Sequence, residues 1–293
     1  MCVTTPDRLC AMRCALGLTV SLFAASAVRG QTFTPLGDVV TRHPGTGMVT
    51  LYSGGPIAPG LDLVIGNVTV GQATASDGFA LDFEGWLCIG RTAPANGTFT
   101  IDDNSMITAD RLKIGSQGSH GAVSVLGGAS LTFLQDYQTS IAQGGAGYGS
   151  LMIMSGGGVD LGGGVLSVAN TGGGSGDVIV DGAGSSLMVG ANVMPGTPGF
   201  SAFGGAGTGT LTISNNAQAS FESSVTFGDN NSGEGALSIE SGGQMHTDAD
   251  LTIGNLTTGT GLVSGVDSLL DVAGDLVIGW TVASSLVIEN SAE

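Results

Sequence analysis

A short strand motif that closes on glycine or alanine recurs along this chain at nearly constant spacing, and this period constrains the fold more than any other feature. One copy contains Leu211–Thr212–Ile213, Phe221 and Val225–Thr226–Phe227–Gly228. Aliphatic residues alternate there with threonine, which is the period-two pattern of a β-strand. The closing positions are Gly66, Gly90, Gly115, Ala142, Ala169, Gly196, Gly228, Gly254 and Gly279.

The spacings between these positions are 24, 25, 27, 27, 27, 32, 26 and 25 residues. We interpret the one long interval, which begins at Gly196, as a coil with an inserted loop that contains Pro198 and Phe200. Three short strands in each repeat indicate the coil of a solenoid. A lone coil is unstable, because ordering each residue costs about 1–2 kcal/mol and the compensating burial of aliphatic side chains requires stacked neighbours.

The sequence therefore predicts an all-β fold, a single-stranded parallel β-helix (β-solenoid) of about nine coils of roughly 24–27 residues. At ~4.8 Å per coil, the rod would be about 45 Å long. Aliphatic residues and phenylalanine would stack in ladders inside the coils. Threonine, serine and asparagine would line lateral faces that are suited to binding.

Three segments differ in composition. Residues 1–30 have the pattern of a secretory signal peptide, with Arg8 and Arg13 before an apolar run and Ala25–Ser26–Ala27 as a cleavage site. Residues 31–62 contain four prolines and no clear repeat, so we expect an N-terminal cap that covers the first coil. Residues 63–293 form the repeat domain, whose last coil reads as incomplete.

The charge balance is strongly acidic. The chain has seven basic and 24 acidic residues, and residues 1–30 hold three of the basic and one of the acidic ones, which leaves a net charge of −19 for the remainder. Such a surface repels phosphate backbones and argues against a nucleic-acid partner. The apolar run of residues 1–30 is too short to span a membrane, so the sequence predicts no transmembrane segment in the mature chain.

Cysteine usage also fits export. Three of the four cysteines lie within residues 1–30, and only Cys88 remains in the mature chain, where it can form no intramolecular disulfide. Cys88 stands between Leu87 and Ile89, two inward positions of a strand. We expect its side chain to face outward or to be half covered.

Several strings resemble the repeat shared by autotransporter (type V secretion) passenger regions and PEP-CTERM-associated exported proteins. They are Val180–Asp181–Gly182–Ala183–Gly184–Ser185–Ser186–Leu187, Gly209–Thr210–Leu211–Thr212–Ile213–Ser214 and Leu251–Thr252–Ile253–Gly254. The resemblance covers about residues 63–293 and implies a right-handed parallel β-helix outside the cell or on its surface, in association with the outer membrane. Adhesion and surface display are the functions it implies. The sequence shows neither a terminal membrane barrel nor a Pro-Glu-Pro anchor, which leaves the mode of anchoring open.

One group of residues offers an enzymatic alternative. Asp102, Asp103, Arg111, Lys113 and His120 resemble in type the groups that β-helix polysaccharide hydrolases and lyases use on acidic glycans, namely paired carboxylates, a histidine and a basic pair. Adjacent carboxylates in a strand point to opposite faces, however, and the basic pair precedes the histidine, the reverse of the order in those enzymes. We therefore favour turn and surface roles for these residues.

No cofactor motif stands out. Gly172–Gly173–Gly174–Ser175–Gly176–Asp177 resembles a single calcium-binding nonapeptide but has serine at the fourth position and no second copy. Weak Ca²⁺ binding at acidic turns is the remaining alternative, with the candidates Asp181, Asp229, Asp248 and Asp267. The three histidines, His43, His120 and His246, lie far apart in sequence and read as surface or turn residues.

The sequence thus favours a secreted or surface-displayed, non-enzymatic passenger, adhesin-like or structural. Its expected partners are glycans or surface proteins along a lateral face. A carbohydrate-active β-helix enzyme is the alternative. End-to-end self-association through the last coil is a further expectation.

Overall fold

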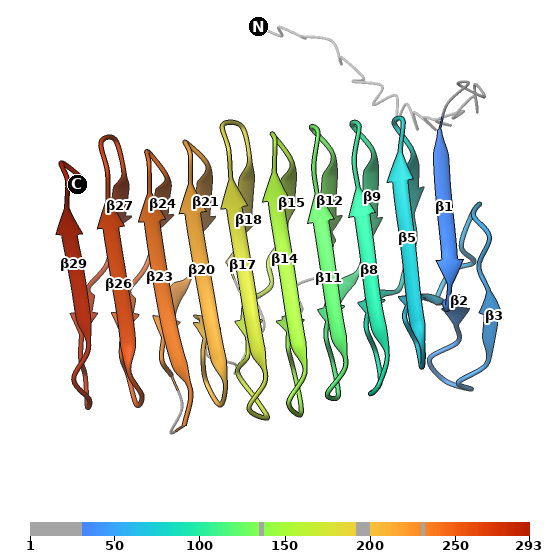
Figure 1. The fold of residues 1–293 in the computed structure, drawn as a ribbon, viewed down its shortest axis with the longest axis horizontal. Coiled ribbons are helices and arrows are strands. Elements are labelled where there is room, and N and C mark those ends of the chain that lie inside the picture. The colour runs from blue at the N-terminus through green and yellow to red at the C-terminus, as the bar shows by residue number, and fades with distance from the viewer. Residues whose placement is uncertain (1–30, 135–137, 192–199, 230–231) are drawn as a thin grey trace, which may run out of the picture.

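The computed structural model of the protein describes residues 31–134, 138–191, 200–229 and 232–293, and every regular element in these ranges is a β-strand (Figure 1). The strands form three sheets that run along one long axis. The predicted signal peptide, residues 1–30, lies outside the described residues, as does Gly196.

The first sheet, sheet A, faces the viewer in Figure 1. Its ten strands, in spatial order, are β1 (Thr32–Gly37), β5 (Val70–Ser76), β8 (Asn96–Ile101), β11 (His120–Val125), β14 (Tyr148–Met154), β17 (Ser175–Asp181), β20 (Thr208–Ser214), β23 (Glu234–Glu240), β26 (Gly259–Ser264) and β29 (Ser285–Glu289).

Sheets B and C form the other two faces of the coil. Sheet B contains β3 (Val49–Leu51), β2 (Val39–Arg42), β4 (Asp62–Ile65), β7 (Trp86–Ile89), β10 (Arg111–Ile114), β13 (Thr139–Ile141), β16 (Leu166–Val168), β19 (Phe200–Phe203), β22 (Ser224–Phe227), β25 (Leu251–Ile253) and β28 (Leu276–Ile278). Sheet C contains β6 (Ala80–Asp82), β9 (Met106–Ala109), β12 (Ser130–Phe133), β15 (Gly158–Asp160), β18 (Ser186–Val189), β21 (Gln218–Phe221), β24 (Gln244–Thr247) and β27 (Leu269–Val272).

Each coil passes through one strand of sheet B, one of sheet A and one of sheet C, as β7, β8 and β9 do. Equivalent strands of successive coils pair in parallel register, so that β11 lies between β8 and β14. The coils advance as a right-handed spiral from β4 to β29 (Figure 1). The eight strands of sheet C complete eight coils, and β28 and β29 begin a ninth. The predicted single-stranded right-handed parallel β-helix is confirmed.

A left-handed backbone conformation marks the residue that closes each sheet B strand. Its φ lies between 50° and 82° at Gly66, Gly90, Gly115, Ala142, Ala169, Gly204, Gly228, Gly254 and Gly279. The assignment of Gly196 to this series is wrong, because Phe203 pairs with Val168 and Gly204 therefore follows in register with Ala169. The extra residues precede β19, and Phe200, which we expected in the inserted loop, begins that strand.

The interior is one continuous apolar core. In sheet A, a column of fully buried side chains runs from coil to coil in register: Phe99, Val123, Leu151, Val178 and Leu211. Glycines at the first or second position of sheet A strands form a second column: Gly71, Gly97, Gly121, Gly149, Gly176, Gly209, Gly235 and Gly259. A methyl group on Gly121 would overlap the backbone carbonyl oxygen of Ile89 and the backbone nitrogen of Gly115.

The two ends of the helix differ. At the N-terminal end, β1 pairs antiparallel with β5, and β2 pairs antiparallel with both β3 and β4. The ring of Phe33 packs 5.4 Å from that of Phe79 and 6.2 Å from that of Phe99, and Tyr52 is buried beside it. These aromatic side chains lie over the core of the first coil.

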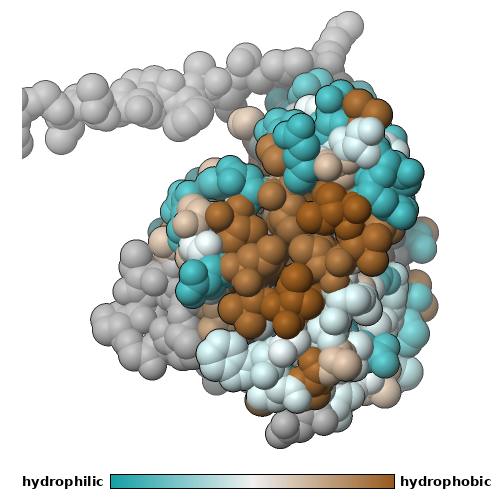
Figure 2. All heavy atoms as spheres, turned by 90° about the vertical axis from the view of Figure 1, so that its left-hand side faces the viewer, coloured by the Kyte–Doolittle hydropathy of each residue, from teal (hydrophilic) through white to brown (hydrophobic). Residues whose placement is uncertain are grey.

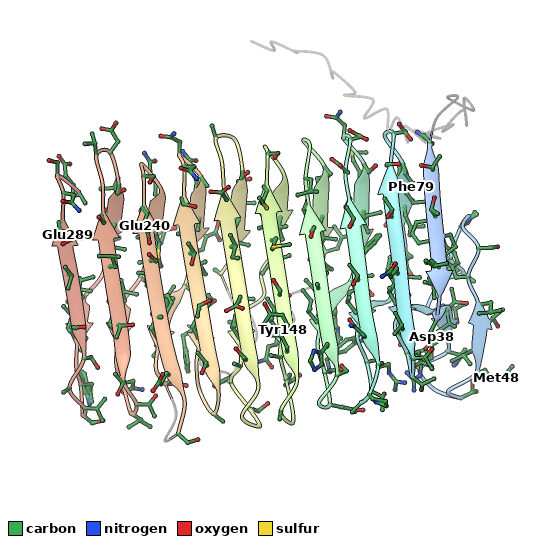
Figure 3. The ribbon with its side chains drawn as sticks, in the orientation of Figure 1. Asp38, Met48, Phe79, Tyr148, Glu240 and Glu289 are labelled. Carbon is green, nitrogen blue, oxygen red and sulfur yellow. The ribbon has the colours of Figure 1, made fainter. Side chains whose placement is uncertain are left out.

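Viewed from the C-terminal end, the molecule presents apolar side chains at its centre (Figure 2). Exposed apolar residues of β28, β29 and the segment between them are Leu276, Ile278, Trp280, Val287 and Ile288. The strand edges at this end pair with no further strand in the described part of the chain. Along the sides, by contrast, the outward positions that alternate with the core carry polar groups such as Tyr148 and Glu240 (Figure 3).

Candidate functional site

The residues of the predicted hydrolase-like group occupy separate parts of the coil. Asp102 and Asp103 lie in the turn between β8 and β9, where Asp103 has a φ of 51° and its backbone N–H donates to Asp102 Oδ1 at 2.8 Å. His120 begins β11, opposite Asn96 at the start of β8. The whole length of a six-residue strand therefore separates the two carboxylates from the imidazole, about 17 Å at ~3.3 Å per residue.

The basic pair lies on another face. Arg111 and Lys113 project from β10 in sheet B, and both lie against the ring of Trp86. The structure thus brings Arg111 and Lys113 together but places them away from the carboxylates and from His120. The five side chains do not converge on one cleft.

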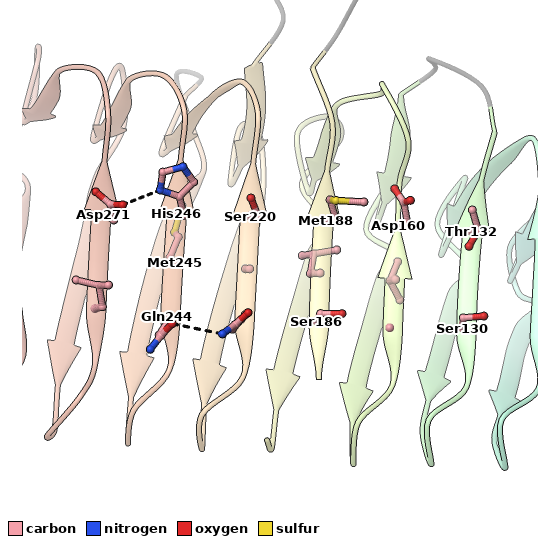
Figure 4. Close-up of a pocket in the computed structure, with 16 residues that line it drawn as sticks. Ser130, Thr132, Asp160, Ser186, Met188, Ser220, Gln244, Met245, His246 and Asp271 are labelled. Atoms are coloured by element: carbon pink, nitrogen blue, oxygen red, sulfur yellow. Dashed lines mark hydrogen bonds and ion pairs between the residues drawn. The ribbon is translucent and has the colours of Figure 1, made fainter. Parts of the chain in front are cut away.

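A groove with a volume of about 590 Å³ lies on sheet C (Figure 4). It crosses the outward faces of six strands, β12 to β27, and at ~4.8 Å per strand it is about 24 Å long. Two columns of outward residues follow the groove in register. The first is Ser130, Gly158, Ser186, Gln218, Gln244 and Leu269, and the second is Thr132, Asp160, Met188, Ser220, His246 and Asp271.

Six of the twelve residues in these columns carry a hydroxyl or amide group, and they lie on β12, β18, β21 and β24. Gln218 donates from Nε2 to Gln244 Oε1 at 3.4 Å, across two neighbouring coils. Such side chains both donate and accept hydrogen bonds. Met188 adds an exposed apolar surface between them. The groove therefore presents repeated polar contacts along an extended, solvent-open path.

His246 is held between two carboxylates at the C-terminal end of this groove. Its Nδ1 lies 2.8 Å from Asp271 Oδ2, and its Nε2 lies 2.7 Å from Asp248 Oδ1. The hydrogen bonds with Asp248 and Asp271 raise the pKa of His246 above its ordinary value of 6.5. Both ring nitrogens are thus engaged by acceptors, which favours the protonated imidazole.

Ser220, His246 and Asp271 share one register on three successive strands (Figure 4). Nucleophilic catalysis by such a trio requires the free imidazole nitrogen to face the hydroxyl. Here that nitrogen is bonded to Asp248 instead. Sequence reasoning missed this alignment, although spacings of 26 and 25 residues, equal to the repeat period, could have indicated it.

We expect an NMR titration to give His246 a pKa above 6.5, and replacement of Asp248 or Asp271 by asparagine to lower it. Because the folded-state pKa is raised, the associated stability is fully present below about pH 6.5 and is lost as the pH rises through the folded pKa. The side chain is 42% exposed, so the contribution is at most about 1 kcal/mol. A His246→Gln variant should thus lose stability at pH 5.5 and match the parent at high pH. An unchanged pKa in both asparagine variants would contradict this assignment.

The candidate Ca²⁺ ligands lie in different turns and bind protein groups. Asp181 accepts hydrogen bonds from Ser214 and Asn215, Asp229 accepts one from Asn255, and Asp248 is bonded to His246. Asp267 lies in an exposed turn with a φ of 63°. Within the described ranges, no three His, Cys, Asp or Glu side chains are grouped as a metal-binding set.

Cys88 is more deeply covered than its sequence position suggested. It faces away from the main core, as expected, but it is buried in a small second cluster with Val40 and Val64, against which Trp86 packs. Burial raises the pKa of its thiol to about 12. The expectation of half coverage is wrong, because β2 and β4 extend sheet B on the N-terminal side of β7 and supply both valines.

In a variant whose cysteines at positions 2, 10 and 14 are replaced by serine, we expect Cys88 to resist Ellman's reagent at neutral pH. The rise in the pKa of the Cys88 thiol to about 12 lowers its thiolate fraction at neutral pH by roughly three orders of magnitude. Full modification should require unfolding in urea. Rapid modification of the folded protein would contradict the burial of Cys88.

Comparison with known proteins identified no matching family model, no similar curated protein and no similar solved structure.

Proposed function

We propose that this protein is an exported, non-enzymatic scaffold whose sheet C groove binds an extended glycan. The observation that carries the proposal is the pair of in-register columns along six strands, in which six of the twelve residues carry a hydroxyl or amide group. Sugar hydroxyls both donate and accept hydrogen bonds, and serine, threonine and glutamine match both roles. The period of the columns suits a ligand that is itself a repeating chain.

The chemistry of the groove supports binding rather than turnover. General acid–base catalysis needs a group that is free to exchange a proton with the substrate. His246 is engaged at both ring nitrogens, one of them by the groove residue Asp271, and the other groove carboxylate, Asp160, accepts a hydrogen bond from the Gly162 N–H. The carboxylates at the turn after β8 lie on another part of the coil. We therefore prefer an adhesin-like or structural role to that of a glycan hydrolase or lyase.

Export is proposed from the sequence alone. The signal-like pattern of residues 1–30, the net acidic charge and the single remaining cysteine support delivery to the cell surface or beyond. No helix in the described part of the chain is long and apolar enough to cross a membrane.

A glycan array with the full chain, read with and without Ca²⁺, tests the proposal. We expect binding of neutral oligosaccharides that is weakened at least tenfold by Gln244→Ala and is unchanged by Thr212→Ala, a matched outward position on sheet A. A parallel reducing-sugar assay should show no product. Release of sugar ends that is abolished by Asp103→Asn would replace this proposal with the enzymatic alternative.

We also propose that a second copy of the chain stacks on the C-terminal end. The apolar centre of that end (Figure 2) and the edges of β28 and β29, which pair with no further described strand, support this proposal. A facing copy would present the same edges and the same apolar residues. Analytical ultracentrifugation should show a dimer that is lost when a polar cap is fused after Glu293. A monomer at all concentrations would overturn the stacking proposal but leave the groove proposal intact.

A further inference from the structure

All the basic side chains of residues 31–293 gather on one face of this acidic rod. The sequence contains only four lysines and arginines in this range, Arg42, Arg91, Arg111 and Lys113. Arg42 ends β2, Arg91 follows β7 closely, and the other two lie on β10. These elements are neighbours at the N-terminal end of sheet B. We call these four residues together with Trp86 the cationic cluster.

Trp86 lies at the centre of the cationic cluster. Lys113 Nζ lies 4.3 Å from the centroid of its ring, and Arg111 Cζ lies 4.8 Å from it. Such cation–π contacts hold the two cations at fixed positions on the sheet. Arg91 donates from Nη1 to Asn67 Oδ1 at 3.1 Å, which orients its guanidinium.

A cavity of about 550 Å³ opens between these cations. Over the described residues, its charged lining consists of Arg42, Arg91, Lys113 and one carboxylate, that of Asp62. Asp62 Oδ2 lies 3.5 Å from Arg42 Nη1. Burial raises the pKa of Asp62, against the opposing effects of the Trp86 N–H and Arg42. One buried acid thus faces three cations, and the cavity has an excess of positive charge.

Clustering of like charges is unfavourable unless an anion offsets it. The cost is notable here because 23 acidic residues are available over the same range and, among those that the structure describes, only Asp62 lines the cavity. Arginine and lysine side chains bind carboxylates through short, charge-assisted hydrogen bonds. The geometry therefore points to an anionic ligand rather than to a role in stability.

The rest of the lining narrows the class of anion. Ser116, Gln117, Gln143 and Thr171 add uncharged donors and acceptors around the cations. The cavity is far larger than a single inorganic ion, and these groups match the hydroxyls of a sugar ring. A long polyanion is disfavoured, because the remaining surface is strongly acidic and would repel it.

We propose that the cationic cluster binds a sugar acid, a glycan unit that carries one carboxylate. The carboxylate would lie between Arg91 and Lys113, and the ring hydroxyls would face the serine, threonine and glutamine side chains. This site lies on sheet B, on a different face of the coil from the sheet C groove, and the two sites share no lining residue.

Tryptophan fluorescence offers a direct readout, because the chain has only two tryptophans and Trp280 follows β28, at the opposite end of sheet B from the cationic cluster. In the full chain with Trp280→Phe, Trp86 becomes the sole reporter. We expect D-glucuronate to change its emission saturably, and D-glucose to bind at least tenfold more weakly. Lys113→Gln and Arg91→Gln should each weaken glucuronate binding tenfold or more. Lys113→Arg should retain it.

Two controls test whether the glucuronate response comes from the cationic cluster. Gln244→Ala, in the sheet C groove, should leave glucuronate binding unchanged, so that failure of one proposal does not affect the other. Circular dichroism should show that the charge variants remain folded. Absence of a glucuronate response, equal affinity for D-glucose, or inorganic sulfate binding as tightly as D-glucuronate would each overturn the proposal.

Discussion

Replacement of Gly121 by alanine is expected to destabilise the protein by about 3 kcal/mol, the upper end of the usual cost of overpacking. The added methyl group would overlap the carbonyl oxygen of Ile89 and the backbone nitrogen of Gly115. Both are main-chain atoms, one at the end of β7 and one directly after β10, so neither can rotate away as a side chain could. Equilibrium unfolding in urea, followed by circular dichroism, measures the effect.

Gly158→Ala is the matched control. Gly158 also lies in a strand, but a methyl group there would meet only Ser186 Oγ, at 3.5 Å. We expect a change within about 0.5 kcal/mol, as for a surface substitution. Equal stability of the two variants would show that the glycine column is not required for coil stacking.

Replacement of Phe203 by alanine is expected to cost about 3–5 kcal/mol. Phe203 is fully buried, and its ring stacks on that of Phe227 with centroids 4.8 Å apart. It also meets the ring of Phe221 edge-on, with centroids 6.5 Å apart. The substitution would leave a cavity at the point where β19 follows the inserted residues.

A double-mutant cycle with Phe227→Ala separates the loss of stability at Phe203 into the coupling between the two rings and the remaining effect of burial. Stacked aromatic pairs couple by about 0.5–1.5 kcal/mol beyond the apolar area that they bury. Leu36→Ala serves as the control, because Leu36 is 66% exposed on an edge strand. If Phe203→Ala lowered the free energy of unfolding no more than Leu36→Ala does, the assignment of Phe203 to the core would be contradicted.

The sequence predicted the fold because the contacts of a solenoid repeat as the sequence does. Positions one period apart, such as Val123 and Leu151, become neighbours on adjacent strands. Alternation within each strand then decides which side chains enter the core. The coil count, the parallel pairing and the inward positions therefore follow from local patterns.

The inserted residues show where this reasoning failed. A glycine at the expected spacing, Gly196, lies close to the true closing residue, Gly204. Spacing alone cannot distinguish them, because both are compatible with a left-handed turn. The pairing of Phe203 with Val168 decides the question.

The candidate sites could not be predicted in the same way, because they form between side chains of neighbouring coils. The length of each coil determines which of these side chains meet. His246 meets Asp271 only because the intervening coil has the length that places them at one register. Arg42 reaches Asp62 because β2, which belongs to no repeat, pairs antiparallel with β4, the first sheet B strand of the helix. The sequence by itself determined a parallel β-helix, because strand alternation and the repeat period are local properties. Only the tertiary structure decided which outward side chains share a groove. Two such side chains become neighbours only if the full length of the coil between them places them side by side on adjacent strands.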